Sequence, residues 1–193
     1  TSTRAGNDTY SFEIVGNLKT IWDGGGVDTF DFSNQNIGVN VDLNEGSFSS
    51  VGFQRTSESG DRNVAKDNIA IAYGVTIENF VGSGSDDNVT LNDANNTIDG
   101  GAGTDTVKVG GLRNSWTISE AGNTYILEST SGDQTDLLTN VELISFDDGI
   151  LSLDSAIALR NQQESVYRLY SALLGREPDD EGLQYWANDL AQG

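Results

Sequence analysis

The 193-residue sequence predicts a mainly β protein that consists of a parallel β-roll, an antiparallel β extension and a short C-terminal helical hairpin. Three patterns predict this class. A nine-residue unit rich in glycine and aspartate repeats in the middle of the chain, apolar and polar residues alternate after it, and apolar residues recur at helical spacing near the end. We expect the roll over residues 1–110, the extension over 111–153 and the hairpin over 154–193, as a piece of a longer protein.

The repeat begins at residue 82 and is the strongest of these patterns. Three consecutive units cover residues 82–90, 91–99 and 100–108, and the third, GGAGTDTVK, matches the calcium-binding nonapeptide G-G-x-G-x-D-x-U-x at every defined position. The sixth position holds Asp87, Asn96 and Asp105. The eighth, the middle of each short strand, holds Val89, Ile98 and Val107, whose side chains we expect to point inward. Three units in one register favour a metal-binding roll over ordinary glycine–aspartate turns.

The spacing of the unit determines where an ion would bind. Six residues make a turn and three make a short strand, so two units complete one coil and each turn stacks on the turn two units later. Glycines let backbone carbonyls face a shared ion, and the aspartate supplies charge. Between turns 82–87 and 100–105 we predict Ca²⁺ held by Asp87, Asp105, Gly82, Gly84, Gly101 and Gly103. On the other edge, where glycines are missing, we predict a second ion at Thr76, Glu78, Asp93 and Asn96.

The remaining elements follow from periodicity. Residues 115–119 and 124–128 alternate like paired strands around a turn at 120–123, and a further strand over 141–146 ends at the turn 147–149. Apolar residues at helical spacing then predict a first helix ended by Gly175, and Pro178 begins a second. The apolar face of the first helix comprises Val166, Leu169, Tyr170, Leu173 and Leu174.

The composition excludes several classes of function. The formal net charge is −20, which would repel nucleic acid, and there is no histidine or cysteine for a Ser-His-Asp triad, a cysteine nucleophile or an ordinary zinc site. The sequence contains no run of about 18 apolar residues, so we expect no membrane-spanning segment. Paired acids such as Asp86 and Asp87 suggest a glycosidase, but adjacent acids in a turn point apart, so we expect no enzyme activity.

Four segments of the roll region together resemble the C-terminal β-roll domain of serralysin-type metalloproteases, a group of secreted proteins with haemolysin-type (RTX) repeats. These segments are TRAGNDTYSF (3–12), TIWDGGGVDTFDFS (20–33), VNVDLNEGSFSSVG (39–52) and NIAIAYGVTIENFVGSGSDD (68–87). The resemblance implies another calcium site, with ligands from Arg4, Gly6, Asp8, Asp23, Gly25 and Asp28. It does not carry over proteolysis, because the protease domain needs a histidine-rich zinc helix and this sequence has no histidine.

Two later segments also resemble parts of large secreted proteins. Residues 132–149 are similar to a segment that follows haemolysin-type repeats, and residues 165–190 to a helical domain of unknown function found downstream of them. The segment between residues 12 and 21 is shorter than in the proteases, and the segment 53–66 is longer and more polar. The scaffold is therefore expected to carry over with local changes.

Calcium is the cofactor that the residues and the resemblance both imply. Extracellular calcium modules bind with a Kd of about 10⁻⁴–10⁻³ M, so such sites stay empty in the cytosol and fill outside the cell. We therefore expect a chain that folds on type I secretion and is extracellular or attached to the cell surface. The first functional hypothesis is an adhesin module that binds a peptide or a glycan; the alternative is an accessory folding and secretion domain of a large exoenzyme.

Overall fold

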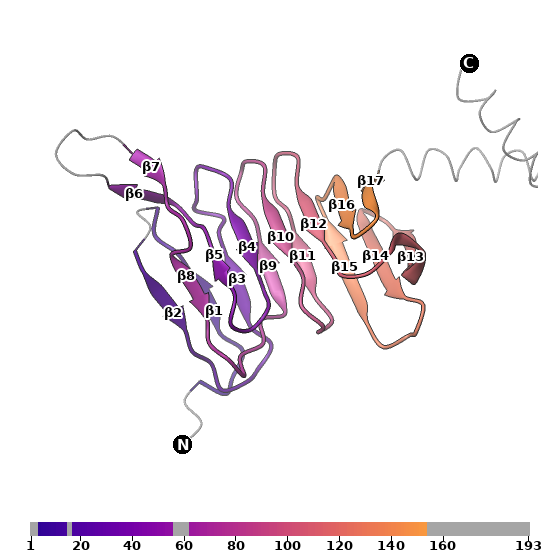
Figure 1. Cartoon of the computed structure of the whole chain (residues 1–193), viewed down its shortest axis with the longest axis horizontal. Coiled ribbons are helices and arrows are strands. Elements are labelled where there is room, and N and C mark those ends of the chain that lie inside the picture. Colours follow the sequence, from indigo (N-terminus) through magenta and orange to yellow (C-terminus); the bar gives the residue numbers. More distant parts are fainter. Residues whose placement is uncertain (1–3, 15–16, 56–61, 154–193) are drawn as a thin grey trace, which may run out of the picture. The chain divides into compact units, whose positions relative to one another are not determined.

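The computed structural model describes residues 4–14, 17–55 and 62–153 (Figure 1). The chain divides into two compact units, residues 1–150 and 151–193. The helical hairpin predicted over 154–193 lies outside the described residues. Within them the protein is almost entirely β, which confirms the predicted class, and the described helical turns include a 3₁₀ turn at Arg113–Ser115. No helix in the described ranges is long and apolar enough to span a membrane.

Two sheets, each with a run of parallel strands, form the roll. One contains seven strands in the order β1 (Thr9–Ser11), β3 (Thr29–Asp31), β9 (Asn79–Val81), β11 (Thr97–Asp99), β15 (Thr135–Thr139), β14 (Thr124–Ser129) and β13 (Trp116–Ala121). The other contains five in the order β17 (Gly149–Ser152), β16 (Leu143–Phe146), β12 (Thr106–Lys108), β10 (Asn88–Thr90) and β4 (Asn40–Asp42). The pairs β1–β3–β9–β11–β15 and β4–β10–β12–β16 are parallel, and successive repeat units alternate between the two sheets.

The core is a pair of apolar columns, one on each sheet. Because the middle residue of each short strand points inward and the strands are in register, the same position recurs from coil to coil. The seven-stranded sheet aligns Tyr10, Phe30, Phe80, Ile98 and Leu138, and the five-stranded sheet aligns Val41, Val89, Val107 and Ile144. All of these side chains are buried. The eighth residue of each nonapeptide therefore faces the core, as predicted.

Two smaller sheets lie at the N-terminal end of the roll (Figure 1). One contains β2 (Lys19–Ile21), β8 (Ile69–Ile71) and β5 (Phe48–Ser49), of which β2 and β8 are parallel and β5 is antiparallel to β8. The other is an antiparallel pair, β6 (Phe53–Arg55) and β7 (Arg62–Val64). The polar insertion noted in the sequence thus begins and ends as a two-stranded ladder (Figure 1).

The antiparallel extension is the hairpin β13–β14, with its turn at Gly122, whose φ is +66°. Strand β14 pairs with β15 in antiparallel fashion, and β15 pairs with β11 in parallel. The extension is therefore continuous with the seven-stranded sheet, and residues 135–139 add a further coil to the roll. The sequence pattern predicted the hairpin itself but not this attachment.

Candidate metal centre

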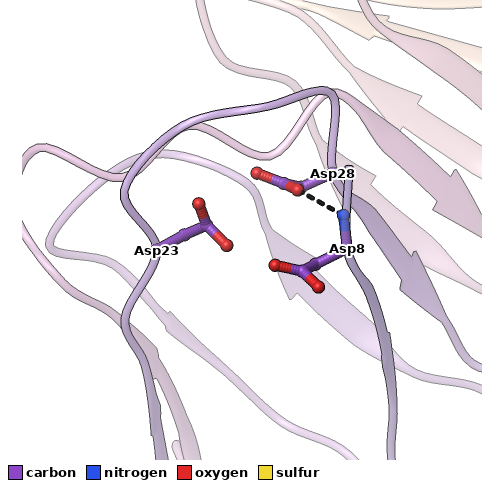
Figure 2. Close-up of side chains that lie close together, drawn as sticks. All are labelled: Asp8, Asp23 and Asp28. Carbon is purple, nitrogen blue, oxygen red and sulfur yellow. Dashed lines mark hydrogen bonds between the residues drawn. The ribbon is translucent and has the colours of Figure 1, made fainter. Parts of the chain in front are cut away.

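Three aspartates converge at the N-terminal end of the roll (Figure 2). Asp8 and Asp28 each precede a strand, β1 and β3, and the pairing of Thr9 with Thr29 brings them side by side. Asp23 lies on the turn that follows β2 and points toward them. One carboxylate oxygen from each lies within 4.8 Å of the other two, and Asp23 and Asp28 are buried.

Asp28 is the most constrained member of this cluster. Its Oδ1 accepts a hydrogen bond from the Asp8 backbone N–H at 2.8 Å, but its Oδ2 is buried and has no hydrogen-bond partner among the described residues. Burial, together with the negative charges of Asp23 and Asp8, raises the pKa of the Asp28 carboxyl. A buried oxygen without a partner next to two further carboxylates is a position that a cation would stabilise.

Asp23 is held differently. Burial opposes its charge, but hydrogen bonds from the Tyr10 hydroxyl and from the Gly25 backbone N–H oppose that effect, and the pKa of Asp23 is lowered. The Arg4 guanidinium lies over the Tyr10 ring at 5.3 Å and adds a positive charge nearby. Asp23 is therefore stabilised as a carboxylate, which is the form that binds metal.

The backbones of the two flanking turns also meet at this cluster. The Arg4 carbonyl accepts a hydrogen bond from the Gly24 N–H at 2.8 Å, and Arg4 itself has a φ of +58°. A Cβ at Gly26 would collide with the Gly6 carbonyl, so only glycine permits this approach. The structure thus brings the predicted donors Arg4, Gly6 and Gly25 onto adjacent turns beside the three aspartates.

Turns 82–87 and 100–105 are stacked, as the pairing of β10 with β12 requires. The Asp87 N–H donates to Asp105 Oδ1 at 2.8 Å, while Asp105 Oδ2 is buried without a partner in the described part of the chain. Burial raises the pKa of Asp105 to about 6, with smaller contributions from the charges of Asp87 and Glu142. Asp87 differs, because its oxygens accept hydrogen bonds from the Val39 N–H and from the N–H and hydroxyl of Ser83.

The glycines predicted for this site lie at close backbone contacts. A Cβ at Gly82 would collide with the Gly100 carbonyl, and a Cβ at Gly101 with the Ser83 carbonyl. At Gly103 a Cβ would lie 2.7 Å from the Ser85 carbonyl carbon, whereas at Gly84 nothing lies within 4 Å. Three of the four glycines are therefore needed for the two turns to approach each other, whatever they bind.

The four residues predicted for the other edge are not gathered around one point. Glu78 Oε2 accepts a hydrogen bond from the Asp28 N–H at 2.7 Å, so its carboxylate lies at the N-terminal cluster. Thr76 and Asp93 line a shallow hollow, and Asn96 is buried with its amide donating to the Glu78 carbonyl at 3.2 Å. Burial and the charge of Asp28 raise the pKa of Glu78.

The structure also shows acids that the sequence analysis did not select. Along one edge, the backbone N–H of one turn donates to a carboxylate on the next turn. The donor–acceptor pairs are Val39 to Asp87, Asp87 to Asp105, and Asp105 to Glu142. Along the other edge, the backbone N–H to carboxylate pairs are Asp8 to Asp28, Asp28 to Glu78, and Asn96 to Asp136. We call these two series the acid ladders. Glu142 and Asp136 lack neighbouring repeat glycines, but each stands two residues before an inward apolar residue, as Asp105 does, and that spacing could have identified them.

The parallel strands and the stacked turns of glycine and acidic residues place this protein in the class of β-rolls built from sequence repeats. Residues 15–180 match the family model described as the C-terminal domain of serralysin (peptidase M10), and the chain belongs to this family. It is 46% identical over 68 residues to serralysin C of Dickeya chrysanthemi, a match that covers 35% of this chain and 12% of that protein. It is 46% identical over 81 residues to a serralysin of Photorhabdus laumondii, covering 42% and 15%, and 35% identical over 111 residues to a serralysin of Proteus mirabilis, covering 51% and 20%.

The matched region is thus a minor part of each of these relatives, between 12% and 20% of their length. The family description places the similarity in the C-terminal domain of serralysin. The resemblance noted in the sequence is therefore shown for the β-roll domain.

Proposed function

We propose that this chain is a calcium-dependent folding module of a secreted protein, and the Asp8–Asp23–Asp28 cluster carries the proposal. Three carboxylates approach within 4.8 Å, and the buried Asp28 Oδ2 has no hydrogen-bond partner in the described ranges. Uncompensated carboxylates at this spacing repel one another and lose hydration. An all-oxygen donor set without histidine or cysteine suits Ca²⁺, which takes six to eight oxygen ligands.

The residues present fit such an ion at two places. At the first, Asp8, Asp23 and Asp28 would hold it, with the Arg4, Gly6 and Gly25 carbonyls on the adjoining turns and Glu78 beside Asp28. At the second, Asp105 offers its free buried oxygen next to Asp87, between the stacked turns of Gly82, Gly84, Gly101 and Gly103. Bound calcium would supply positive charge at the points where the acid ladders bring carboxylates together.

Calcium would act mainly on the folding equilibrium. A ligand that binds only the folded state at about 100 times its Kd adds about 2.7 kcal/mol per site, so two sites approach the whole stability of a small domain. The formal charge of −20 opposes compaction until ions bind. A chain of this kind would stay loose at cytosolic calcium and fold outside the cell, which suits an accessory folding and secretion domain.

The test compares the 193-residue chain in millimolar calcium and in EDTA by circular dichroism and thermal unfolding. We expect a rise in Tm of about 10 °C or more with calcium. Terbium, which occupies calcium sites and emits when an excited aromatic ring is near, should report the N-terminal site, because Tyr10 contacts Asp23 and Trp22 precedes it. The proposal would be overturned if the thermal melts with and without chelator were identical and if terbium emission in the presence of the protein were no stronger than it is with excess magnesium added.

The adhesin hypothesis has less support than the folding role. The relatives are named as serralysins, and none of the named matches is an adhesin. No cluster of the described residues points to a peptide or glycan ligand in the way the carboxylates point to a cation. We therefore put forward the accessory role as the function that the geometry supports best.

A further inference from the structure

The side-chain amide of Gln134 is surrounded by oxygen atoms. Its Nε2 lies 3.0 Å from the Asn92 carbonyl, 3.1 Å from the Ala94 carbonyl, and 3.2 and 3.4 Å from the two carboxylate oxygens of Asp136. An amide NH₂ has two hydrogens, so it cannot donate fully to four acceptors. Four oxygens around one centre is an arrangement more typical of a bound cation than of an amide.

These oxygens lie on two stacked turns, as the ligands of the predicted ion site do. Asn92 and Ala94 are the second and fourth residues of the unit 91–99, the positions that Gly101 and Gly103 hold in the unit 100–108, although 91–96 is the earlier turn of its pair and 100–105 the later. Asp136 is aligned with Asn96, the sixth residue of its unit, because Thr97 pairs with Leu137. The Gln134 amide nitrogen therefore lies where the oxygen donors of two stacked turns converge.

The dimensions of this cage suit the amide. Calcium–oxygen distances are 2.3–2.6 Å, whereas the four contacts of Nε2 span 3.0–3.4 Å. The cage is thus wider than a calcium shell, and the amide fills its centre. Asp136 is fully buried and also accepts a hydrogen bond from the Asn96 N–H at 2.8 Å, so its carboxylate is satisfied in part by neutral donors.

We propose that the Gln134 amide takes the place of a cation between the coils of β11 and β15, so that this end of the roll closes without calcium. The statement that the other stacked turns need calcium rests on the proposed function, whereas the contacts of Gln134 are independent of it. A built-in donor here would give the chain one coil pair that forms before ions bind. A carboxylate at residue 134 should move from the centre of the cage to its edge, where it would add an oxygen ligand and leave the centre to calcium.

The test is the isosteric variant Gln134→Glu, which replaces the amide nitrogen with a carboxylate oxygen. In EDTA its Tm should fall by about 10 °C, because a second buried carboxylate then faces Asp136. In millimolar calcium the Tm should return to within a few degrees of the wild type. Native mass spectrometry should count one more Ca²⁺ per chain in the variant than in the wild type.

Two further variants separate an ion site from a general loss of packing. Gln134→Met keeps the length of the side chain but removes the donor, so its Tm should fall by the same amount in EDTA and in calcium, with no added ion. Gln35→Glu places a carboxylate at another buried glutamine, whose amide donates to the Phe12 carbonyl at 2.7 Å, and should likewise gain no ion.

The outcomes distinguish this inference from the proposed function. A Gln134→Glu chain that binds no more calcium than the wild type, or that calcium does not restore, overturns the inference. An equal gain in Gln35→Glu overturns it as well, because the effect would then be one of added charge. A wild type that binds no calcium overturns the proposed function, while the difference between Gln134→Glu and the wild type still decides the role of Gln134.

Discussion

At Asp28 a single side chain serves two purposes that can be separated. One oxygen accepts the Asp8 N–H in the acid ladder, and the other is buried without a partner beside two carboxylates. Asp28→Asn keeps the acceptor, removes one charge and places an N–H₂ donor where the free oxygen lay. We expect opposite effects: about 1 kcal/mol more stability without calcium, and at least about tenfold weaker calcium binding.

Thermal melts in chelator and in calcium, with a calorimetric titration, measure both effects of Asp28→Asn. The matched control is Asp31→Asn, which makes the same change of charge at the far end of β3, where Asp31 Oδ1 accepts the Ser33 N–H at 2.9 Å. The control should leave calcium affinity nearly unchanged. Shifts of the same sign in both buffers would argue against a cation at Asp28.

At the scale of elements, the roll depends on how closely successive coils approach. A Cβ at Gly100 would collide with the Asn140 carbonyl and lie 2.6 Å from Asp105 Oδ2. Gly100→Ala should therefore push the coil of β11 away from that of β15 and cost about 3 kcal/mol in the free energy of unfolding. Gly110→Ala is the control, because a Cβ there meets nothing within 4 Å, and it should change stability by less than about 0.5 kcal/mol.

Urea unfolding is measured in millimolar calcium and again in EDTA, because a Cβ at Gly100 also approaches Asp105 Oδ2 of the second proposed ion site. The expected result is a lower midpoint for Gly100→Ala and an unchanged one for Gly110→Ala. Equal midpoints would mean that the contact between Gly100 and Asn140 relaxes without cost, and that the coils are not held at this distance by backbone packing.

The strands also show which features of the fold the local sequence pattern can predict. The nonapeptides predicted which side chains point inward, because a three-residue strand has only one middle position, and Val89, Ile98 and Val107 are buried accordingly. The pairing of β15 with β11 was not predictable in this way. Residues 100–134 intervene, and register between distant strands depends on the hairpin β13–β14, which returns the chain to the roll.

The candidate site likewise has some residues that the repeat spacing predicted and others that it did not. The glycine–aspartate turns at 82–87 and 100–105 were predicted from spacing, because stacking follows from the repeat. The convergence of Asp8, Asp23 and Asp28 came from the family resemblance, since these residues lie outside the three nonapeptides at 82–108. Asp136 and Glu142 were missed because their coils lack the glycines that mark the others. The predicted helical hairpin stays a prediction.

For the molecule as a whole, the decisive quantity is the number of buried acids relative to compensating charges. The chain carries 30 acidic and 10 basic residues, and Asp28, Asp87, Asp105 and Asp136 are among the buried polar groups. Burial raises the pKa of all four. Either bound protons or bound cations can therefore reduce the repulsion among the buried acids of the folded chain. Proton binding is favoured by low pH, whereas cation binding is favoured by higher pH.

Without calcium, the roll should become more stable as the pH falls from 7 to 5. Burial raises the pKa of Asp105 and of Asp136 from the ordinary value of 3.8 to about 6, so the folded chain binds protons that the unfolded chain does not. This contribution is fully present below about pH 4 and is lost as the pH rises through about 6. With calcium bound, protons compete with the ion, so acidification should instead lower stability.

Urea midpoints between pH 5 and 7, measured on desalted protein in calcium-free buffer and again in millimolar calcium, test this reversal. Asp136→Asn should flatten the calcium-free profile, because it removes one of the two groups whose pKa was given above as raised to about 6. A calcium-free midpoint that is constant or falls on acidification would show that protons do not relieve the buried acids. The repulsion that we assign to them would then be too weak to keep the chain unfolded before calcium binds.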